Sequence, residues 1–268
     1  MKRPRASASS LLTGRGTAGL LAEILVPVAI VAAIAVWSAG AGAFYFPPLT
    51  DILRTFADTW LFDRFGSDVL PSLGRMAAGY LIAAVVGVTA GCLLALIPLA
   101  ARLAEPIVEF LRAVPPPVLL PFGILVFGTG DQMKIFVIAL TCTFPILLTT
   151  VEGVRGIDRT TLEMARMYGL TGTARFRRLV LPAASPHIFA GLRTSLSLAL
   201  ILMVISELVA STDGIGFFVV QAQRTFAIPE MWSGIILLGV LGYLLNALLS
   251  LVERRVLRWH RAMGETRR

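Results

Sequence analysis

Long stretches of the chain carry almost no charged side chain, and each has a length that suits membrane crossing. They lie at Ile24–Ala43, between Arg75 and Arg102, between Arg112 and Asp131, between Lys134 and Glu152, from about Ile188 to Ala210, and between Glu230 and Glu253. An α-helix needs roughly 20 apolar residues to cross the hydrocarbon core of a bilayer. The pattern therefore predicts an all-α integral membrane protein with six transmembrane helices, in one domain at residues 21–262.

The composition excludes an ordinary soluble domain. Hydrophobic residues make up 56% of the 268 residues and charged residues only 15%, against about 45–50% and 25% in soluble domains. The mean hydropathy is +0.81. So few charges cannot cover a surface that faces water, so lipid must surround most of the chain.

The basic residues predict the orientation. The net charge is +8, and most Lys and Arg residues lie before the first span, after the second, between the fourth and fifth, and after the last. The other connections hold Arg54, Arg64, Arg75, Lys134 and Arg224. Because basic residues are enriched in cytoplasmic loops, we expect cytoplasmic termini with basic tails at 1–20 and 263–268. The loop 152–187 is then cytoplasmic, the loops 44–72 and 211–230 are external, and the positive charge does not indicate nucleic acid.

A cleaved signal peptide is the alternative for the first span. The basic start and the small residues at 39–43 fit a cleavage site. The apolar run is longer than the roughly 7–15 residues of a signal peptide, which favours an uncleaved helix.

Small residues predict where helices approach one another. The second span carries a ridge with one small residue every four positions, and the fifth has a weaker one at Gly191, Ser195 and Ala199; the first ridge is Gly79, Ala83, Gly87, Gly91 and Ala95. Such ridges let two backbones come close. We favour packing within the chain over a dimer seam. The prolines at 115–117, 121 and 145 predict kinks in the third and fourth spans.

One carboxylate lies inside a predicted span. Glu207 is expected to face protein or water, because a charge in lipid is unfavourable. It is either part of a pathway or gate, or close to the outer interface. Arg193 lies about 21 Å earlier along a helix, too far to pair with it directly. Together with Ser206, these residues are the candidates for a pathway or gate.

No catalytic set, metal site or resident cofactor is predicted. A phosphate-binding loop of the GxxxxGK[ST] type is absent, and neither Lys2 nor Lys134 follows a glycine. A formal GxGxxG match at Gly14, Gly16 and Gly19 follows no strand, so we treat it as chance. The histidines, His187 and His260, lack metal-spaced partners, and Cys92 and Cys142 are expected to be small core residues.

The loop 152–187 has an unusual pattern. A helix is expected between Asp158 and Tyr168, ended by Gly169. Thr171 or Thr173 can cap a second short helix at Thr173–Leu179, which presents Arg175, Arg177 and Arg178 around Phe176, and Leu181-Pro182 is expected to stop it. Two short helices with a tight elbow fit either a knob that docks on a soluble partner or an amphipathic segment on the membrane surface.

A resemblance favours the knob. The loop resembles the EAA motif of ABC-importer permeases, with Glu163-Met164-Ala165, then Gly169, then Leu179, then Leu181-Pro182 at the spacing of the motif. It differs in having Met164 for Ala and Leu179 for Ile. Residues 47–262 as a whole look like the nitrate/sulfonate/taurine group, in stretches such as LRAVPPPVLLPFGILVFGTGDQMKIF and ISELVAS.

The resemblance implies a type I ABC-importer permease fold in a bacterial plasma (inner) membrane. It implies two ATPase subunits that bind ATP-Mg, a second permease copy, an extracytoplasmic solute-binding protein, and a small anionic solute such as a sulfonate, taurine or nitrate. Residues of the loop would couple to the ATPase: Glu163, Met164, Ala165, Gly169, Leu170, Thr171, Gly172, Thr173, Arg175, Phe176, Leu181 and Pro182. The alternatives are a secondary transporter, which would need ionisable coupling groups near mid-membrane, or a membrane assembly protein without an ATPase.

Overall fold

The computed structural model describes residues 44–258 and most positions of 25–40. The side chain of Phe62 is left out of this description. The predicted tails at 1–20 and 263–268 lie outside the described residues, as does much of the first predicted span. Every element at 44–258 is helical.

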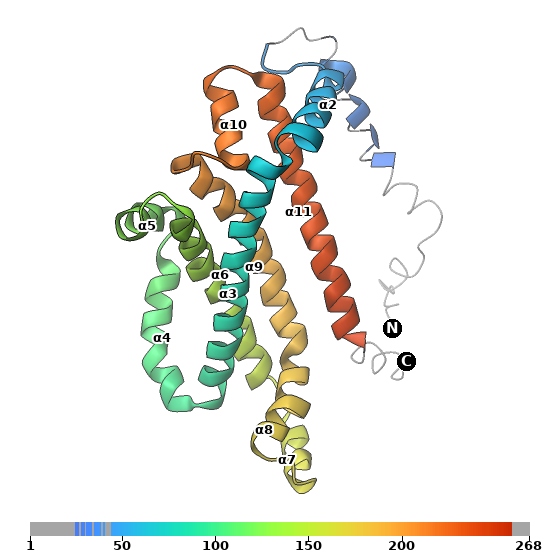
Figure 1. Cartoon of the computed structure of the whole chain (residues 1–268). Helices are drawn as coiled ribbons and strands as arrows, with labels where there is room; N and C mark the ends of the chain where they lie inside the picture. Colours follow the sequence, from blue (N-terminus) through green and yellow to red (C-terminus); the bar gives the residue numbers. More distant parts are fainter. Residues whose placement is uncertain are drawn as a thin grey trace, which may run out of the picture.

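Four helices are long and apolar enough to cross a membrane (Figure 1). All four begin before their charge-free runs, and α6 and α11 also end after them, because charged side chains are accommodated once they find partners or reach the edge of the bilayer. Their bounds are α3 (Leu70–Leu96), α6 (Asp131–Arg155), α9 (Leu181–Val209) and α11 (Ile228–Val256). These helices confirm the second, fourth, fifth and sixth predicted spans, but Arg75 and Lys134 lie inside helices rather than beside them.

The third predicted span, between Arg112 and Asp131, is not one continuous helix: the chain is broken at the prolines where a kink was predicted. The chain instead forms α4 (Pro98–Ala113), a single 3₁₀ turn η3 (Pro116–Val118) and α5 (Leu119–Phe127), with a bend of 86° between the two helical segments. Three consecutive prolines remove three backbone donors, and Val114 and Pro115 are extended. With nine residues, α5 is about 14 Å long, too short to cross alone. Arg102 and Arg112 consequently lie on a helix, not in a short loop.

The ridge of small residues on α3 packs within the chain, as favoured from the sequence. A Cβ on Gly87 would come within 2.9 Å of Ile146 Cβ, and one on Gly91 within 2.7 Å of Thr150 Cβ. Both contacts are to α6. The weaker ridge on α9 also meets α6, where the Ser195 hydroxyl donates to the carbonyl of Cys142 at 2.9 Å. Helix α6 is therefore held between α3 and α9.

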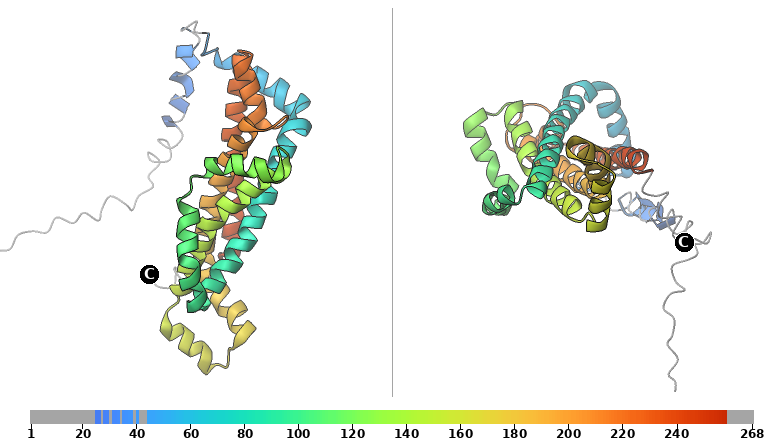
Figure 2. Two further views of the ribbon diagram at one scale, coloured as in Figure 1. Left: turned by 90° about the vertical axis from the view of Figure 1, so that its left-hand side faces the viewer. Right: turned by 90° about the horizontal axis from the view of Figure 1, so that it is seen from below.

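The short helices gather at two opposite ends of the bundle (Figures 1 and 2). At one end are α2 (Leu49–Asp58), two π-helical turns, η1 (Thr59–Asp63) and η2 (Phe65–Val69), and α10 (Ile215–Arg224). Trp60 is 1% exposed there, and its indole N–H donates to Ser233 of α11 at 3.1 Å. At the other end, α7 (Arg159–Met167) and α8 (Gly172–Arg175) project beyond the long helices. Helix α4 stands to one side of the bundle.

Candidate coupling elbow and buried ion cluster

The elbow after α7 is fixed by its backbone. The N–H of Gly169 donates to the carbonyl of Arg166, and the N–H of Leu170 to that of Ala165, both at 2.9 Å. This is a Schellman motif, in which the residue after the helix takes a left-handed conformation. Gly169 supplies it with φ of +71°. The helix predicted between Asp158 and Tyr168 and its end at Gly169 are both confirmed.

The elbow presents apolar side chains to its surroundings. Met164, Met167 and Tyr168 are 53%, 87% and 85% exposed, whereas Ala165 is buried at 6%. These three exposed residues share one helix face by their spacing of three and four positions. Met167 and Tyr168 were not among the predicted coupling residues. The positions of Met167 and Tyr168, three and four residues after Met164 of the motif, are the signal in the sequence that could have indicated these two residues.

The second short helix differs from the prediction in its length and in its end. Helix α8 has four residues and runs through a π-helical turn, η4 (Phe176–Val180), directly into α9. The expected stop at Leu181-Pro182 is wrong, because the π-helical turn leads directly into α9 and Pro182 follows it at the start of that helix. Residues 172–209 therefore form a single helical run of 38 residues. Thr171 precedes α8 in an extended conformation, but its side chain makes no capping hydrogen bond.

The aromatic side chain of this segment points inward. Phe176 packs partly buried against a small core of Cys92, Val154, Val180, Ala184 and Ile188. Arg177 and Arg178 are exposed, whereas Arg175 is half-buried and its Nε is a buried atom without a hydrogen-bond partner. The exposed apolar surface of the knob is thus formed by α7 and Tyr168, while the second helix supplies the positive charge and anchors the knob to the bundle.

A cluster of charged side chains around a buried arginine lies toward the other end of the bundle. Arg75 of α3 donates from Nε to Asp131 at 2.7 Å, from Nη1 to Glu207 at 3.2 Å and from Nη2 to Asp213 at 2.6 Å. The Arg75 side chain is 7% exposed and that of Glu207 is not exposed. The ends of α6 and α9 and the segment before α10 therefore meet at one guanidinium group.

Glu207 is fully bonded in this cluster. Besides the guanidinium group, Oε1 accepts from the Ser72 hydroxyl at 2.6 Å and Oε2 from the Gly216 N–H at 2.9 Å. The N–H of Ile215 donates to Ser72 Oγ at 3.0 Å. A Cβ on Gly214, where φ is +105°, would lie 2.5 Å from the carboxyl carbon of Glu207. The first two backbone N–H groups of α10 thus bond this helix to a side chain of α3 and to a side chain of α9.

The structure does not bring together the three predicted pathway or gate residues. Ser206 is not exposed, and its hydroxyl donates to the Met203 carbonyl within α9. Arg193 is half-exposed and bridges to Ser250 and Glu253 of α11. Glu207 is sealed in the cluster described above. Their gating role stays a prediction.

The apolar spans and the projecting elbow indicate a membrane protein with an exposed surface for a partner, and comparison with known proteins shows the family. The profile of the family described as "Binding-protein-dependent transport system inner membrane component" matches residues 84–258, and the chain belongs to this family. It is an ABC-importer permease, a multi-pass inner-membrane transport subunit rather than an enzyme, with a separate ATPase and a solute-binding protein as implied partners.

Individual relatives agree with this assignment. The chain is 32% identical to the putative aliphatic sulfonates transport permease protein SsuC of Bacillus subtilis, over 92% of this chain and 90% of the relative. It is 36% identical to the nitrate import permease protein NrtB of Leptolyngbya laminosa, over 70% of this chain and 67% of the relative. Its fold is similar to that of a chain in an inward-facing structure of the MetNI methionine ABC transporter. In that comparison the TM-score is 0.63 and the identity 21%, over 70% of this chain and 94% of the other.

Proposed function

We propose that this permease imports a small anion and that the elbow after α7 couples it to the ATPase. The observation that carries the coupling role is the exposed apolar face of Met164, Met167 and Tyr168 at the projecting end of the molecule. Large exposed apolar side chains beside positive charge are typical of a surface that a protein partner covers. The Leu181-Pro182 end of the motif lies in the first turn of α9, so movement of the elbow passes directly into a spanning helix.

The proposed assembly has two copies of this permease, two ATPase subunits and one solute-binding protein on the external side. ATP and Mg²⁺ bind to the ATPase, since the chain has no phosphate-binding loop of its own. In this assembly the elbow and both termini face the cytoplasm, which the excess of basic residues in the loop 152–187 supports. The anionic solute is supported by the relatives, whose names specify aliphatic sulfonates and nitrate.

Two glycines provide a matched test of the coupling role. Gly169 and Gly128 both have positive φ, +71° and +74°, and a Cβ on either would meet nothing within 4 Å. Valine at either site therefore adds backbone strain. The strain is larger at Gly128, whose ψ of −167° belongs to a region that essentially only glycine adopts, but only Gly169 shapes the elbow. We expect Gly169→Val to lose the ATPase on copurification of the complex and Gly128→Val to retain it.

Tyr168→Ala tests the surface without changing the backbone. The side chain is 85% exposed, so its removal should leave folding unaffected while weakening ATPase binding. Retention of the ATPase by both Gly169→Val and Tyr168→Ala, with normal ATP-dependent uptake, would show that coupling occurs elsewhere.

A further inference from the structure

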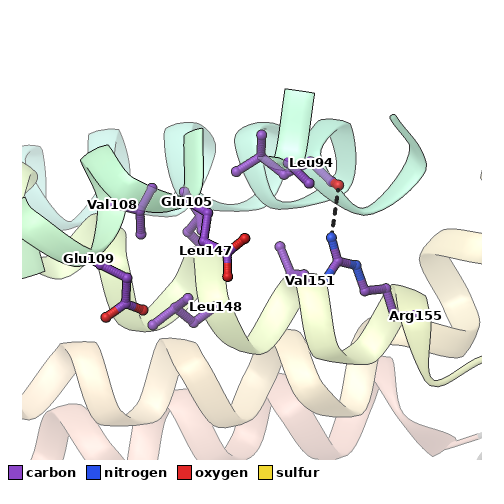
Figure 3. A pocket seen from close by; sticks show the side chains of 9 residues that line it. Leu94, Glu105, Val108, Glu109, Leu147, Leu148, Val151 and Arg155 are labelled. Atoms are coloured by element: carbon purple, nitrogen blue, oxygen red, sulfur yellow. Dashed lines mark hydrogen bonds between the residues drawn. The ribbon is translucent and has the colours of Figure 1, made fainter. Parts of the chain in front are cut away.

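Two neighbouring cavities form a groove between α4 and α6. The first has a volume of about 150 Å³ and is lined by residues that include Glu105, Glu109, Leu148 and Arg155 (Figure 3). The second has a volume of about 330 Å³ and is lined by residues that include Arg112, Thr141, Pro145 and Leu148. They share Leu148, and Glu109 of the first is paired with Arg112 of the second. The groove runs from the end of α6 that leads into the elbow toward the proline corner.

The inner cavity lies at the middle of a spanning helix. Helix α6 has 25 residues and is about 37 Å long. Thr141 and Pro145 lie about 15 and 21 Å from its first residue, Asp131. Because Arg112 lines the same cavity, its charge is placed near mid-depth of the bilayer.

An arginine at this depth needs surroundings that this chain does not provide. Its side chain is 53% exposed, and of the residues that the structure describes, only Glu109 on the preceding turn pairs with it, at 2.5 Å. Arg75, by contrast, is 7% exposed and meets three carboxylates. Charged groups within spans face protein or water and mark the routes of ions and substrates. Arg112 therefore faces a polar space and not lipid.

A polar group without a hydrogen-bond partner lines the same cavity. The hydroxyl of Thr141 is buried and has no hydrogen-bond partner. The other threonines of α6, Thr143, Thr149 and Thr150, each donate to the carbonyl four positions earlier. Pro145 also lacks the N–H that would bond the carbonyl of Thr141. A buried polar group without a partner calls for a bound molecule or water.

We propose that Arg112 and Thr141 form the anion contact of the translocation path, in a groove that opens toward the elbow. This inference rests on the proposed import of an anion. The guanidinium group donates charge-assisted hydrogen bonds to an oxygen of the passing anion, and the Thr141 hydroxyl donates one more. Glu109 holds Arg112 when the anion is absent, so the contact is transient. A cavity of about 330 Å³ is at the small end of ligand sites, as a small solute requires.

Accessibility of a cysteine tests the groove without knowledge of the solute. Arg112→Cys should react with a charged, membrane-impermeant thiosulfonate added from the elbow side, in inside-out vesicles that contain the whole complex. The matched control is Val85→Cys, at mid-length of α3 and 64% exposed, where lipid or another copy is the neighbour. Native Cys92 and Cys142 are 5% and 0% exposed and give little background. Equal, slow reaction at both engineered positions would overturn the proposal.

Transport tests the anion contact itself. The complex is reconstituted in vesicles with its binding protein, and uptake of labelled taurine, ethanesulfonate and nitrate is measured. Arg112→Gln should lower the maximal rate roughly tenfold and leave KM unchanged, because the binding protein sets the affinity. Arg112→Lys should recover most of the rate. Arg102→Gln, on the same helix but outside the residues that line the groove, should behave as wild type.

The outcomes separate the two proposals. Wild-type uptake that Arg112→Gln does not reduce would overturn the anion contact and leave the import function intact. Absence of ATP-dependent uptake of all three probes by the wild type would count against the proposed anion import, and the cysteine experiment would still decide whether the groove is a water-accessible path.

Discussion

At the scale of single residues, the buried Arg75 is the point on which three carboxylates converge, one of them buried and two exposed to a large part. It bonds to Asp131, Glu207 and Asp213, which come from three different parts of the chain. Removal of one partner from a buried ion pair leaves a charge without compensation, typically at a cost of 3–5 kcal/mol. We predict that Arg75→Met destabilises the purified protein by about 3–5 kcal/mol, measured as a large fall in the melting temperature in detergent. The double variant Arg75→Met, Glu207→Gln should lose less stability than Arg75→Met alone, because the glutamine amide leaves no uncompensated charge in the buried site.

The control at this scale is the half-exposed pair of Arg193 and Glu253. Exposed ion pairs contribute about 0–1 kcal/mol, so Arg193→Met should change the melting temperature little. If Arg193→Met lowered the melting temperature as much as Arg75→Met does, the stabilising effect of the ion pair at Arg75 could not be attributed to its burial.

Single residues also show what the sequence could and could not predict. Glu207 was predicted to face protein or water from its place in an apolar run. Its partners Ser72 and Arg75 are separated from it by 135 and 132 positions, and nothing in the periodicity indicates which residues meet across such a distance. The sequence predicted the position of Gly169 because a helix that ends on a glycine is a local event.

At the scale of elements, close packing of α3 on α6 depends on the absence of side chains. Gly91 and Gly74 lie on the same helix, but a Cβ on Gly91 would meet the Leu147 carbonyl at 2.8 Å, and one on Gly74 would meet nothing within 4 Å. We predict that Gly91→Ala destabilises the protein by about 1–3 kcal/mol, as overpacking does. Gly74→Ala should be neutral or stabilising by up to about 1 kcal/mol, since alanine favours the helix. Thermal melting of both variants in the same detergent measures the difference, and equal values would refute tight packing at Gly91.

The spanning helices were predicted from the sequence more accurately than the bend between α4 and α5. Apolar runs bounded by charges gave α6 and α11 to within about four residues, because the length of a spanning helix is set by the bilayer, whereas α9 begins seven residues before its predicted start. The proline run predicted a kink in the third span, and the chain bends there by 86° and leaves a short α5. Hydropathy measures preference for lipid and carries no information on direction, so the size of the bend could not be read from the apolar pattern.

At the scale of the whole molecule, one helical run connects the two ends. Residues 172–209 extend for about 57 Å from the elbow to the cluster around Glu207. One continuous helical run, which includes the π-helical turn at Phe176–Val180, therefore connects the elbow with the cluster, and the groove between α4 and α6 lies beside it. Movement imposed at the elbow reaches the opposite end of the bundle without passing through a loop.

This architecture predicts the source of energy for uptake. A secondary transporter needs an ionisable group in the membrane that can gain and lose an ion. Glu207 is held by Ser72, Arg75 and Gly216 and is not exposed, so it is poorly placed for that role. We expect uptake by vesicles that contain the complete complex and ATP to continue when ionophores collapse the ion gradients, and to stop when ATP is removed with the gradients intact. The same vesicles with Gly169→Val permease should show no uptake under either condition. Uptake that follows the gradients and ignores ATP would require Glu207 to leave its partners during transport.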